Sequence, residues 1–330
     1  MKELSKKSER YIYLDILKII AAFSIVFYHT GRVDVGDFVN GIYFPTFTRV
    51  LFNLNVISIP VFFMVNGALI MKKEYSTEKI YMKAAKVALL LFVWSFTDFP
   101  SWFFKTLIVI YLLYPFLLKI YKNKKARAIL EAIVFLFPFA YNFAIVILMR
   151  FSPDLSISLL GKTIALDSVP IRTGAFTMYS LLYVFIGATL SKKKMNPIYA
   201  FLLFVAGIAL VTWDGTVLSN YSAEVFDSVN GSFPTIGALI AATGLFMLIK
   251  SIKTDNEKAV KCCSYLGSRV LYTYLFHLII IKRFVYIYIL TSQENNAFIV
   301  IAVSLLVYIA AMIAGIILEK IPYVNYLVKI

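Results

Sequence analysis

The sequence predicts an all-α, polytopic membrane protein with about ten transmembrane helices and both termini in the cytoplasm. Hydrophobic residues make up 61% of the 330 residues and charged residues only 15%, and the mean hydropathy is +0.81. Apolar runs of about 18 to 22 residues recur along the whole chain, each long enough to cross a bilayer. Because lipid cannot satisfy open backbone groups, each run is expected to be helical. This composition excludes an ordinary soluble enzyme.

The apolar runs define the expected spans. In chain order they cover residues 11–31, 50–71, 84–99, 102–121, 128–150, 173–191, 196–213, 233–251, 268–290 and 297–318. Only the short turn around Asp98–Ser101 separates the third span from the fourth. No internal repeat, low-complexity tract or linker is visible, so residues 1–330 are expected to form a single membrane domain without a soluble appendage.

The basic residues indicate the orientation of the bundle. Lysine-rich clusters fall on one side, at residues 72–86, 119–127, 192–194, 250–261 and 320–329. The connections on the other side are poorer in Lys and Arg and include residues 32–49, 151–172 and 214–232. The positive-inside rule makes the lysine-rich side cytoplasmic, which predicts a multi-pass protein of the cell (inner) membrane. The net charge of +15 therefore reflects topology, and no nucleic-acid partner is predicted.

The first span carries three ionisable residues, Asp15, Lys18 and His29, which we call the polar stripe. Each helical residue advances by about 100°, so Lys18 and His29 lie only about 20° apart in projection. Asp15, three residues before Lys18, lies on the same face and within ion-pair reach. Ionisable groups in hydrocarbon cost about 2.5 to 3.5 kcal/mol, so the stripe is expected to face the bundle interior or a wet cavity.

The polar stripe has a structural interpretation beside the functional one. Asp15 and Lys18 could simply pair or snorkel near the cytoplasmic end, with His29 an interfacial residue at the outer end. The common face favours a functional site. Lys18 and His29 would lie about 16 Å apart along the helix axis, so they cannot touch the same atom, although an extended ligand could contact both.

The segment from Tyr13 to His29 resembles the opening helix of the acyltransferase-3 family. These are bacterial membrane proteins that move acyl groups, usually acetyl, onto cell-surface carbohydrates. Their signature is Arg or Lys, ten residues, then His, which Lys18 and His29 match, with an accompanying acidic residue at Asp15. The segment Ile59–Ile70 is similar to the family's Pro-x-Phe-Phe-x-x-Ser-Gly, with Asn66 in place of Ser.

Two later segments extend the resemblance. Trp102 and the residues up to Pro115 resemble the family's His-x-Trp-Phe segment and its continuation, although Pro100 stands where the His is expected. The segment Leu266–His277 resembles Gly-x-x-Ser/Thr-x-x-x-Tyr-x-x-His. Gly267, Tyr274 and His277 match, and Val270 stands in place of the hydroxyl residue. Four matches in the family's order cover most of the chain.

The resemblance implies a membrane O-acetyltransferase that moves acetyl from cytoplasmic acetyl-CoA to a cell-surface or lipid-linked polysaccharide. It implies that His29 is the general base or a transient acyl carrier, and that Lys18, steered by Asp15, binds or polarises the acyl-CoA. The substrate or acyl-CoA binding candidates are His277, Lys79, Lys83, Asn66, Trp102 and Arg283.

Four of these binding candidates have a plainer alternative explanation. Lys79 and Lys83 occupy the place of two family arginines and could capture the phosphates of acyl-CoA, or could be ordinary cytoplasmic lysines. A lone buried histidine such as His277 more often satisfies a neighbour than performs catalysis. Arg283 could snorkel or meet an anionic carbohydrate.

The sequence shows no nucleotide fingerprint, metal-ligand cluster or serine-hydrolase elbow. Cys262 and Cys263, adjacent in a lysine-rich connection, suggest neither a structural disulfide nor a metal site. No bound cofactor is therefore expected, and acetyl-CoA would be a substrate. A secondary transporter or lipid-linked sugar flippase would also place charges inside a helical bundle. A structural or sensory membrane subunit is a further alternative.

Overall fold

The structure is a computed structural model that describes residues 11–31, 37–73, 75–97, 101–152, 156–159, 162–165, 178–254, 256–285 and 297–322. The helices of the first half are α1 (Ile12–Thr30), α2 (Phe47–Asn53), η1 (Leu54–Ile57), α3 (Ser58–Lys73), α4 (Thr77–Trp94), α5 (Trp102–Leu112), α6 (Tyr114–Lys122), α7 (Lys124–Val134), η2 (Phe135–Ala140) and α8 (Tyr141–Phe151). Those of the second half are α9 (Tyr179–Leu190), α10 (Pro197–Ser222), α11 (Ile236–Ser251), α12 (Glu257–Gly267), α13 (Val270–Ile280), η4 (Ile281–Val285) and α15 (Ala297–Glu319).

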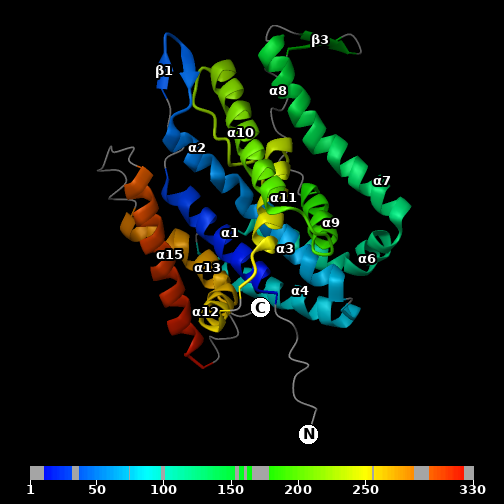
Figure 1. Cartoon of the computed structure of the whole chain (residues 1–330), viewed down its shortest axis with the longest axis vertical. Helices are drawn as coiled ribbons and strands as arrows, with labels where there is room; N and C mark the ends of the chain where they lie inside the picture. The colour runs from blue at the N-terminus through cyan, green and yellow to red at the C-terminus, as the bar shows by residue number, and fades with distance from the viewer. Residues whose placement is uncertain are drawn as a thin grey trace.

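Two small antiparallel hairpins accompany the helices. β1 (Asp37–Val39) pairs with β2 (Ile42–Phe44), and β3 (Ser156–Leu159) pairs with β4 (Lys162–Ala165). Both lie in connections that the sequence assigned to one side of the membrane, and both lie at the upper end of the molecule in Figure 1. The other regular elements of the described residues are helices, in agreement with the all-α prediction.

Five helical segments of the described chain are long and apolar enough to cross a membrane, by length and composition alone. They are Ile12–Thr30, Phe47–Met71, Lys124–Phe151, Pro197–Ser222 and Ala297–Glu319. A sixth would be the pair α5 and α6, which is bent by 67°, and α9 and α11 are shorter apolar helices. Helices also occupy the other expected spans, but the number of ten crossings and the cytoplasmic termini stay predictions.

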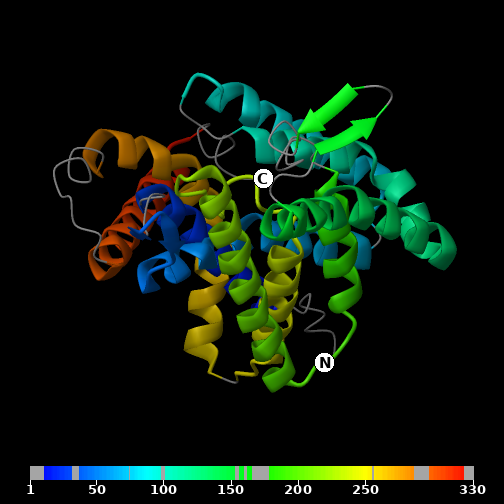
Figure 2. The same ribbon diagram turned by 90° about the horizontal axis from the view of Figure 1, so that it is seen from above.

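Helix α1 forms the centre of the bundle. It packs against α3, α11, α12, α13 and α15, and Figure 1 shows it between α13 and α15 on one side and α3 and α9 on the other. Leu17, Ala21 and Val26 of α1 are fully buried. The view from above shows α10 and α11 running side by side (Figure 2). Within the polar stripe Asp15 is buried and Lys18 and His29 are half-buried, so the stripe faces the bundle interior.

Small residues allow the helices to approach closely. A Cβ added at Gly67 of α3 would lie 1.9 Å from the carbonyl oxygen of Val184, and one at Gly187 of α9 would lie 2.1 Å from that of Met64. The two glycines thus sit on facing sides of the α3–α9 contact, with no room for a methyl group. Such small-residue contacts are typical of membrane helices, whose association depends on close packing.

Two expected connections proved to be partly helical. The sequence placed 214–232 in a loop, but α10 continues to Ser222, and Asp214 is buried inside the bundle. The connection expected at 250–261 contains the first five residues of α12, which begins after the Asn256 cap and includes both cysteines. The first prediction was wrong because a single polar residue such as Asp214 does not end a helix that is packed on its neighbours. The second was wrong because the Asn256 side chain caps a new helix inside the lysine-rich connection.

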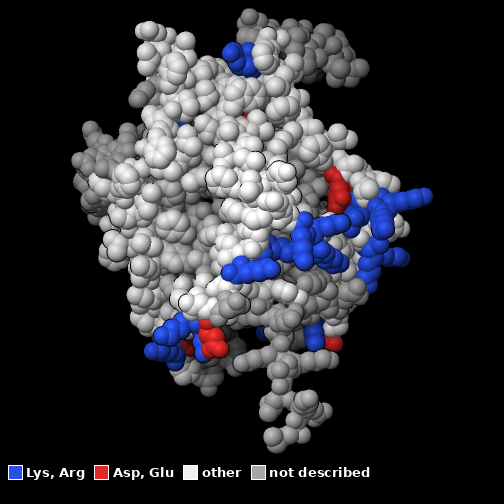
Figure 3. Space-filling view, viewed as in Figure 1, with Lys and Arg blue, Asp and Glu red and all other residues white. Residues whose placement is uncertain are grey.

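The charged residues are distributed unevenly over the molecule. In the space-filling view, the Lys and Arg side chains of the visible face gather mainly on its lower half (Figure 3). The lower half contains the α6–α7 connection and α12. This distribution matches the lysine clusters that set the predicted orientation.

Candidate functional site

The first part of the site is an ion pair at the start of α1. Lys18 Nζ lies 2.6 Å from Asp15 Oδ1, and the two side chains are 20% and 4% exposed. The two residues are one helical turn apart, which is the contact that their spacing predicts. Asp15 is thus a buried carboxylate that holds Lys18 in place.

Gly267, at the end of α12, packs directly on this ion pair. A Cβ added there would lie 2.5 Å from the Asp15 Cβ and 2.8 Å from its Oδ1. The absence of a side chain at Gly267 therefore lets α12 approach α1 at the aspartate. The resemblance includes Gly267 in a family motif. In the structure this glycine allows close packing of α12 against Asp15 of the polar stripe.

The second part of the site is a pair of histidines at the other end of α1. The ring of His29, in the last turn of α1, lies 5.2 Å from the ring of His277, centroid to centroid, with an interplanar angle of 43°. These are the only two histidines of the chain. They are separated by 248 positions in the sequence, and the sequence did not predict that they meet.

The surroundings of His277 fix its tautomer. Its Nδ1 lies 3.0 Å from the carbonyl oxygen of Thr273 and 2.9 Å from that of Tyr274. A carbonyl oxygen only accepts, so Nδ1 carries a hydrogen and donates it. In the neutral ring the lone pair is then on Nε2, which is buried and has no hydrogen-bond partner among the described residues. His277 therefore offers one buried acceptor beside His29.

His29 opens onto a small pocket of about 80 Å³, which we call the histidine pocket. Its lining comprises Ile25, Tyr28, His29, Ser58, Ile59, Trp102, Val229, Asn230, Phe233 and Tyr274. The Trp102 ring stacks on that of Phe233 at 6.0 Å between centroids. An aromatic lining with a few polar groups is typical of a binding site for a small molecule or part of one.

A buried charge network lies next to the histidine pocket. Tyr28 Oη donates to Asp227 Oδ2 at 2.7 Å, and Asp227 Oδ1 accepts from the backbone amides of Val229 and Asn230 at 2.9 and 3.1 Å. Arg49, which is 2% exposed, donates to Ser228 Oγ at 2.9 Å and to the carbonyl oxygen of Phe226. The network ties α1, α2 and the loop after α10 together.

Sequence reasoning missed the Arg49–Asp227 network. Both residues lie in segments read as loops, and each looked like an ordinary connection residue. The available signal was that Arg49 directly precedes an apolar run and is the only basic residue between 34 and 71. A cation beside a predicted span requires a partner, and Asp227 was one of several carboxylates on the same predicted side.

The remaining predicted binding residues are not part of the histidine pocket. Asn66 accepts a hydrogen bond from Tyr111 Oη at 2.9 Å through its Oδ1. Lys79 is exposed on α4, and Lys83 Nζ lies 4.7 Å from the centroid of the Tyr75 ring. Arg283 is exposed in η4. The structure thus brings together His29, His277 and Trp102, and leaves these four residues elsewhere.

The structure describes one of the two remaining departures from the family pattern, Val270 and Pro100. Val270 opens α13 and is half-buried, whereas Pro100 lies outside the described residues. No three His, Cys, Asp or Glu side chains gather as a metal site would require within the described part of the chain.

Comparison with known proteins identifies one family. The sequence profile of the acyltransferase-3 family, described as an acyltransferase domain, matches residues 11–97 and 84–319. These matches include both histidines and the Asp15–Lys18 pair. No curated protein and no solved structure matches the chain at a significant level. The family match covers nearly the whole sequence and agrees with an apolar helical bundle, and the chain belongs to the acyltransferase-3 family of membrane acyltransferases.

Proposed function

We propose that the protein is a membrane O-acetyltransferase that moves an acetyl group from cytoplasmic acetyl-CoA to a hydroxyl of a cell-surface or lipid-linked polysaccharide. The acceptor would be an O-antigen, a capsule or an exopolysaccharide, and the protein would work in the cell membrane. The observation that carries this proposal is the contact between His29 and His277 beside the histidine pocket. Acetyl-CoA is a substrate in this proposal, and no bound cofactor is required.

Acyl transfer to an alcohol needs a base for the hydroxyl proton. His29 lines the pocket and is the candidate base. It takes the hydroxyl proton as the new C–O bond forms, and it returns this proton to the sulfur as the thioester C–S bond breaks, so that CoA leaves as the thiol. His277 is a positioning residue, because its Nε2 can accept the hydrogen of the second His29 nitrogen and so orient the base. A base that is oriented by a further acceptor is a recurring arrangement in acyl transfer.

The acyl donor must reach His29 from the opposite end of α1. Lys18, held by Asp15, lies about 16 Å from His29 along the helix axis. In our proposal Lys18 binds or polarises the acyl-CoA at the cytoplasmic end. The acyl group then reaches the acceptor either because the long CoA arm threads into the bundle, or because the group is relayed between an inner and an outer site with His29 as a transient carrier. Mass-spectrometric detection of an acyl group on His29 would favour the second route.

The aromatic wall of the histidine pocket suits a carbohydrate acceptor. Trp102 is 37% exposed, stacks on Phe233 and presents a flat surface against which the apolar face of a sugar can pack. Ser58 and Asn230 add polar groups to the same lining. These features support an acceptor with both an apolar face and hydroxyl groups.

The test is acetyl transfer by purified protein in vesicles, with labelled acetyl-CoA and an acceptor glycan. His29→Ala should lower turnover by about 100- to 10,000-fold, the usual contribution of a general base. His277→Gln should lower turnover less and leave KM for acetyl-CoA unchanged. A matched control is His29→Gln, which keeps a polar side chain without a base at neutral pH and should resemble His29→Ala.

Three outcomes would contradict the proposal. Near wild-type acetyl transfer by His29→Ala would show that His29 is not the general base. Movement of a lipid-linked sugar across the vesicle membrane without acceptor-dependent release of CoA would instead assign a transporter or flippase. Unchanged acetylation of surface glycans in cells lacking the protein would favour a structural or sensory subunit.

A further inference from the structure

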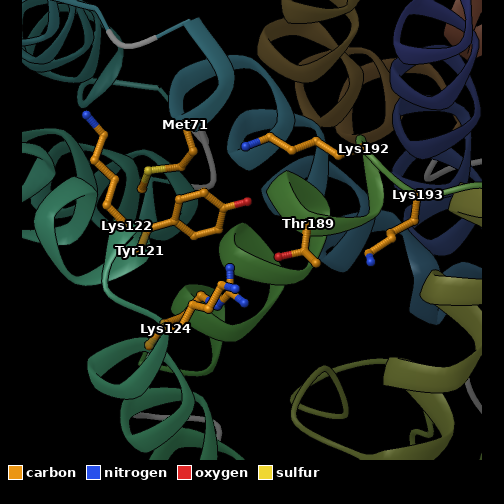
Figure 4. A pocket seen from close by; sticks show the side chains of 8 residues that line it. Met71, Tyr121, Lys122, Lys124, Thr189, Lys192 and Lys193 are labelled. Atoms are coloured by element: carbon orange, nitrogen blue, oxygen red, sulfur yellow. The ribbon is translucent and has the colours of Figure 1, made fainter.

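A second and larger pocket lies away from the histidine pocket. It has a volume of about 310 Å³, and we call it the lysine pocket. Its lining comprises Met71, Tyr121, Lys122, Lys124, Arg127, Thr189, Lys192 and Lys193 (Figure 4). Helix α3 connects the two pockets, because Ser58 and Ile59 at its start line the histidine pocket and Met71 near its end lines the lysine pocket. From Ile59 to Met71 the helix axis advances by about 18 Å.

The lysine pocket concentrates positive charge. Five of its eight lining residues are cationic, and none of the eight is acidic. Arg127 Nε lies 3.7 Å from Glu131 Oε1, in an ion pair whose side chains are 27% and 29% exposed. The lining itself therefore carries an excess of positive charge. Clustered like charges repel one another, and a bound anion would relieve that repulsion.

Neutral hydrogen-bond donors complete the lining. The Tyr121 ring lies 5.2 Å from Arg127 Cζ and 5.4 Å from Lys192 Nζ, so it separates two of the cations. In Figure 4 the hydroxyl groups of Tyr121 and Thr189 point toward the space between the basic side chains. Thr189 Oγ1 is buried and has no hydrogen-bond partner among the described residues. A buried hydroxyl without a partner beside such a pocket points to a ligand that accepts hydrogen bonds.

The backbone that carries these lysines is well anchored. Lys250 Nζ donates to the carbonyl oxygens of Leu190 and Ser191, both at 2.7 Å, and to that of Lys193. This fixes the end of α9, from which Lys192 and Lys193 project. On the other wall, the Asn123 side chain caps α7 by accepting from two backbone amides, at 3.0 and 3.1 Å. The cations are therefore presented from two fixed connections.

We propose that the lysine pocket binds a phosphate group. A phosphate offers several acceptor oxygens and a full negative charge, which matches lysine, arginine and hydroxyl donors arranged around one space. Exposed apolar residues of the adjacent helices, Phe116 of α6 with Ile129 and Ile133 of α7, show that a lipid-facing surface lies near this pocket. Basic pockets between membrane helices at the cytoplasmic side bind anionic lipid headgroups. The phosphate can belong to such a headgroup or to a soluble phosphate ester.

The experiment measures binding to the purified full chain and needs no enzymatic turnover. Native mass spectrometry would count bound phosphatidylglycerol, with phosphatidylcholine, which has a phosphate but no net charge, as the reference lipid. Calorimetric titration with inorganic pyrophosphate and with CoA would test the soluble source. We expect at least one of these probes to bind, with an affinity that falls as salt is added.

Two double variants remove two positive charges each, one pair in the lysine pocket and the other pair on α12. Lys192→Gln with Lys193→Gln should weaken binding roughly 30-fold, since each lysine near a phosphate contributes about 1 kcal/mol. Lys258→Gln with Lys261→Gln, on exposed positions of α12, should leave binding unchanged. Thr189→Val removes only the buried hydroxyl and should weaken binding roughly two- to tenfold.

The results separate this proposal from the proposed function. Binding of phosphatidylglycerol alone supports a lipid headgroup, and binding of pyrophosphate or CoA supports a soluble phosphate ester. If no probe binds, or if both double variants weaken binding equally, the lysine pocket is not a phosphate site. His29→Ala should bind the probe as the wild type does, so a failed acetyl-transfer test would leave this result intact.

Discussion

The charged residues near the two pockets differ in their burial and in how fully they are paired. Beside the histidine pocket, Arg49 is almost fully buried, and it and Asp227 are hydrogen-bonded to the surrounding protein. Around the lysine pocket, the cations outnumber the nearby carboxylates, and Arg127 and Glu131 remain partly exposed. A buried and satisfied network holds groups in a fixed geometry. An open cluster of one sign attracts a charged ligand.

This difference supports our proposals that the two ends of the bundle have different tasks. A chemical step needs its groups held in place, and the hydrogen bonds of His277 to two carbonyl oxygens fix the residue that we propose to orient the base. Capture of a ligand needs charge that is accessible, as the lysine pocket provides. The three predictions that follow test the difference, beginning with the largest expected effect.

Removing one arginine at each pocket should reveal the contrast directly. Arg49→Met leaves Ser228 Oγ and the carbonyl oxygen of Phe226 without their donor and Asp227 without a nearby cation. We expect a loss of about 3 kcal/mol in the free energy of unfolding, as when one member of a buried charge network is removed. Arg127→Met, the matched control, removes a partly exposed pair and should cost less than about 1 kcal/mol. Chemical unfolding in detergent micelles measures both. Equal losses would show that the two ends do not differ in this way.

The polar stripe itself was predictable because it depends on one helix. The spacing of Asp15, Lys18 and His29 places them on one face, and the positions of the apolar runs locate most helices. These features require only local periodicity and hydropathy. The Asp15–Lys18 contact follows for the same reason, since residues three apart on a helix are neighbours.

The composition of each pocket was not predictable, because it depends on which helices pack together. The His29–His277 contact joins α1 to α13, and the lysine pocket joins the α6–α7 connection to the end of α9. Hydropathy does not encode these pairings. The length of α10 was also misjudged: Asp214 suggested an end, but the helix continues with Thr216 and Ser219 bonded back to its own carbonyl oxygens.

The second prediction concerns the contact of Gly267 with the polar stripe. In Gly267→Ala the new methyl group would collide with Asp15, so α12 must move or the Asp15–Lys18 pair must distort. We expect a loss of about 1 to 3 kcal/mol in stability, the range for an overpacked site, and a raised KM for acetyl-CoA. Ser268→Ala, at the next, exposed position, is the control and should change neither value. Wild-type stability and KM in Gly267→Ala would show that α12 need not approach Asp15 closely.

The smallest effect is expected at the two lysines of α4. Lys79 and Lys83 match a family position that could capture acyl-CoA phosphates, yet neither lines the lysine pocket. If capture depends on the lysine pocket, Lys79→Gln with Lys83→Gln should raise KM for acetyl-CoA less than about threefold, the loss expected from weakened long-range attraction alone. Lys192→Gln with Lys193→Gln has the same charge change and should raise KM more if the bound phosphate is that of CoA. If the α4 variant instead raises KM more than the lysine-pocket variant, donor capture lies on α4. The lysine pocket would then bind a lipid headgroup, which need not affect the KM for a soluble donor.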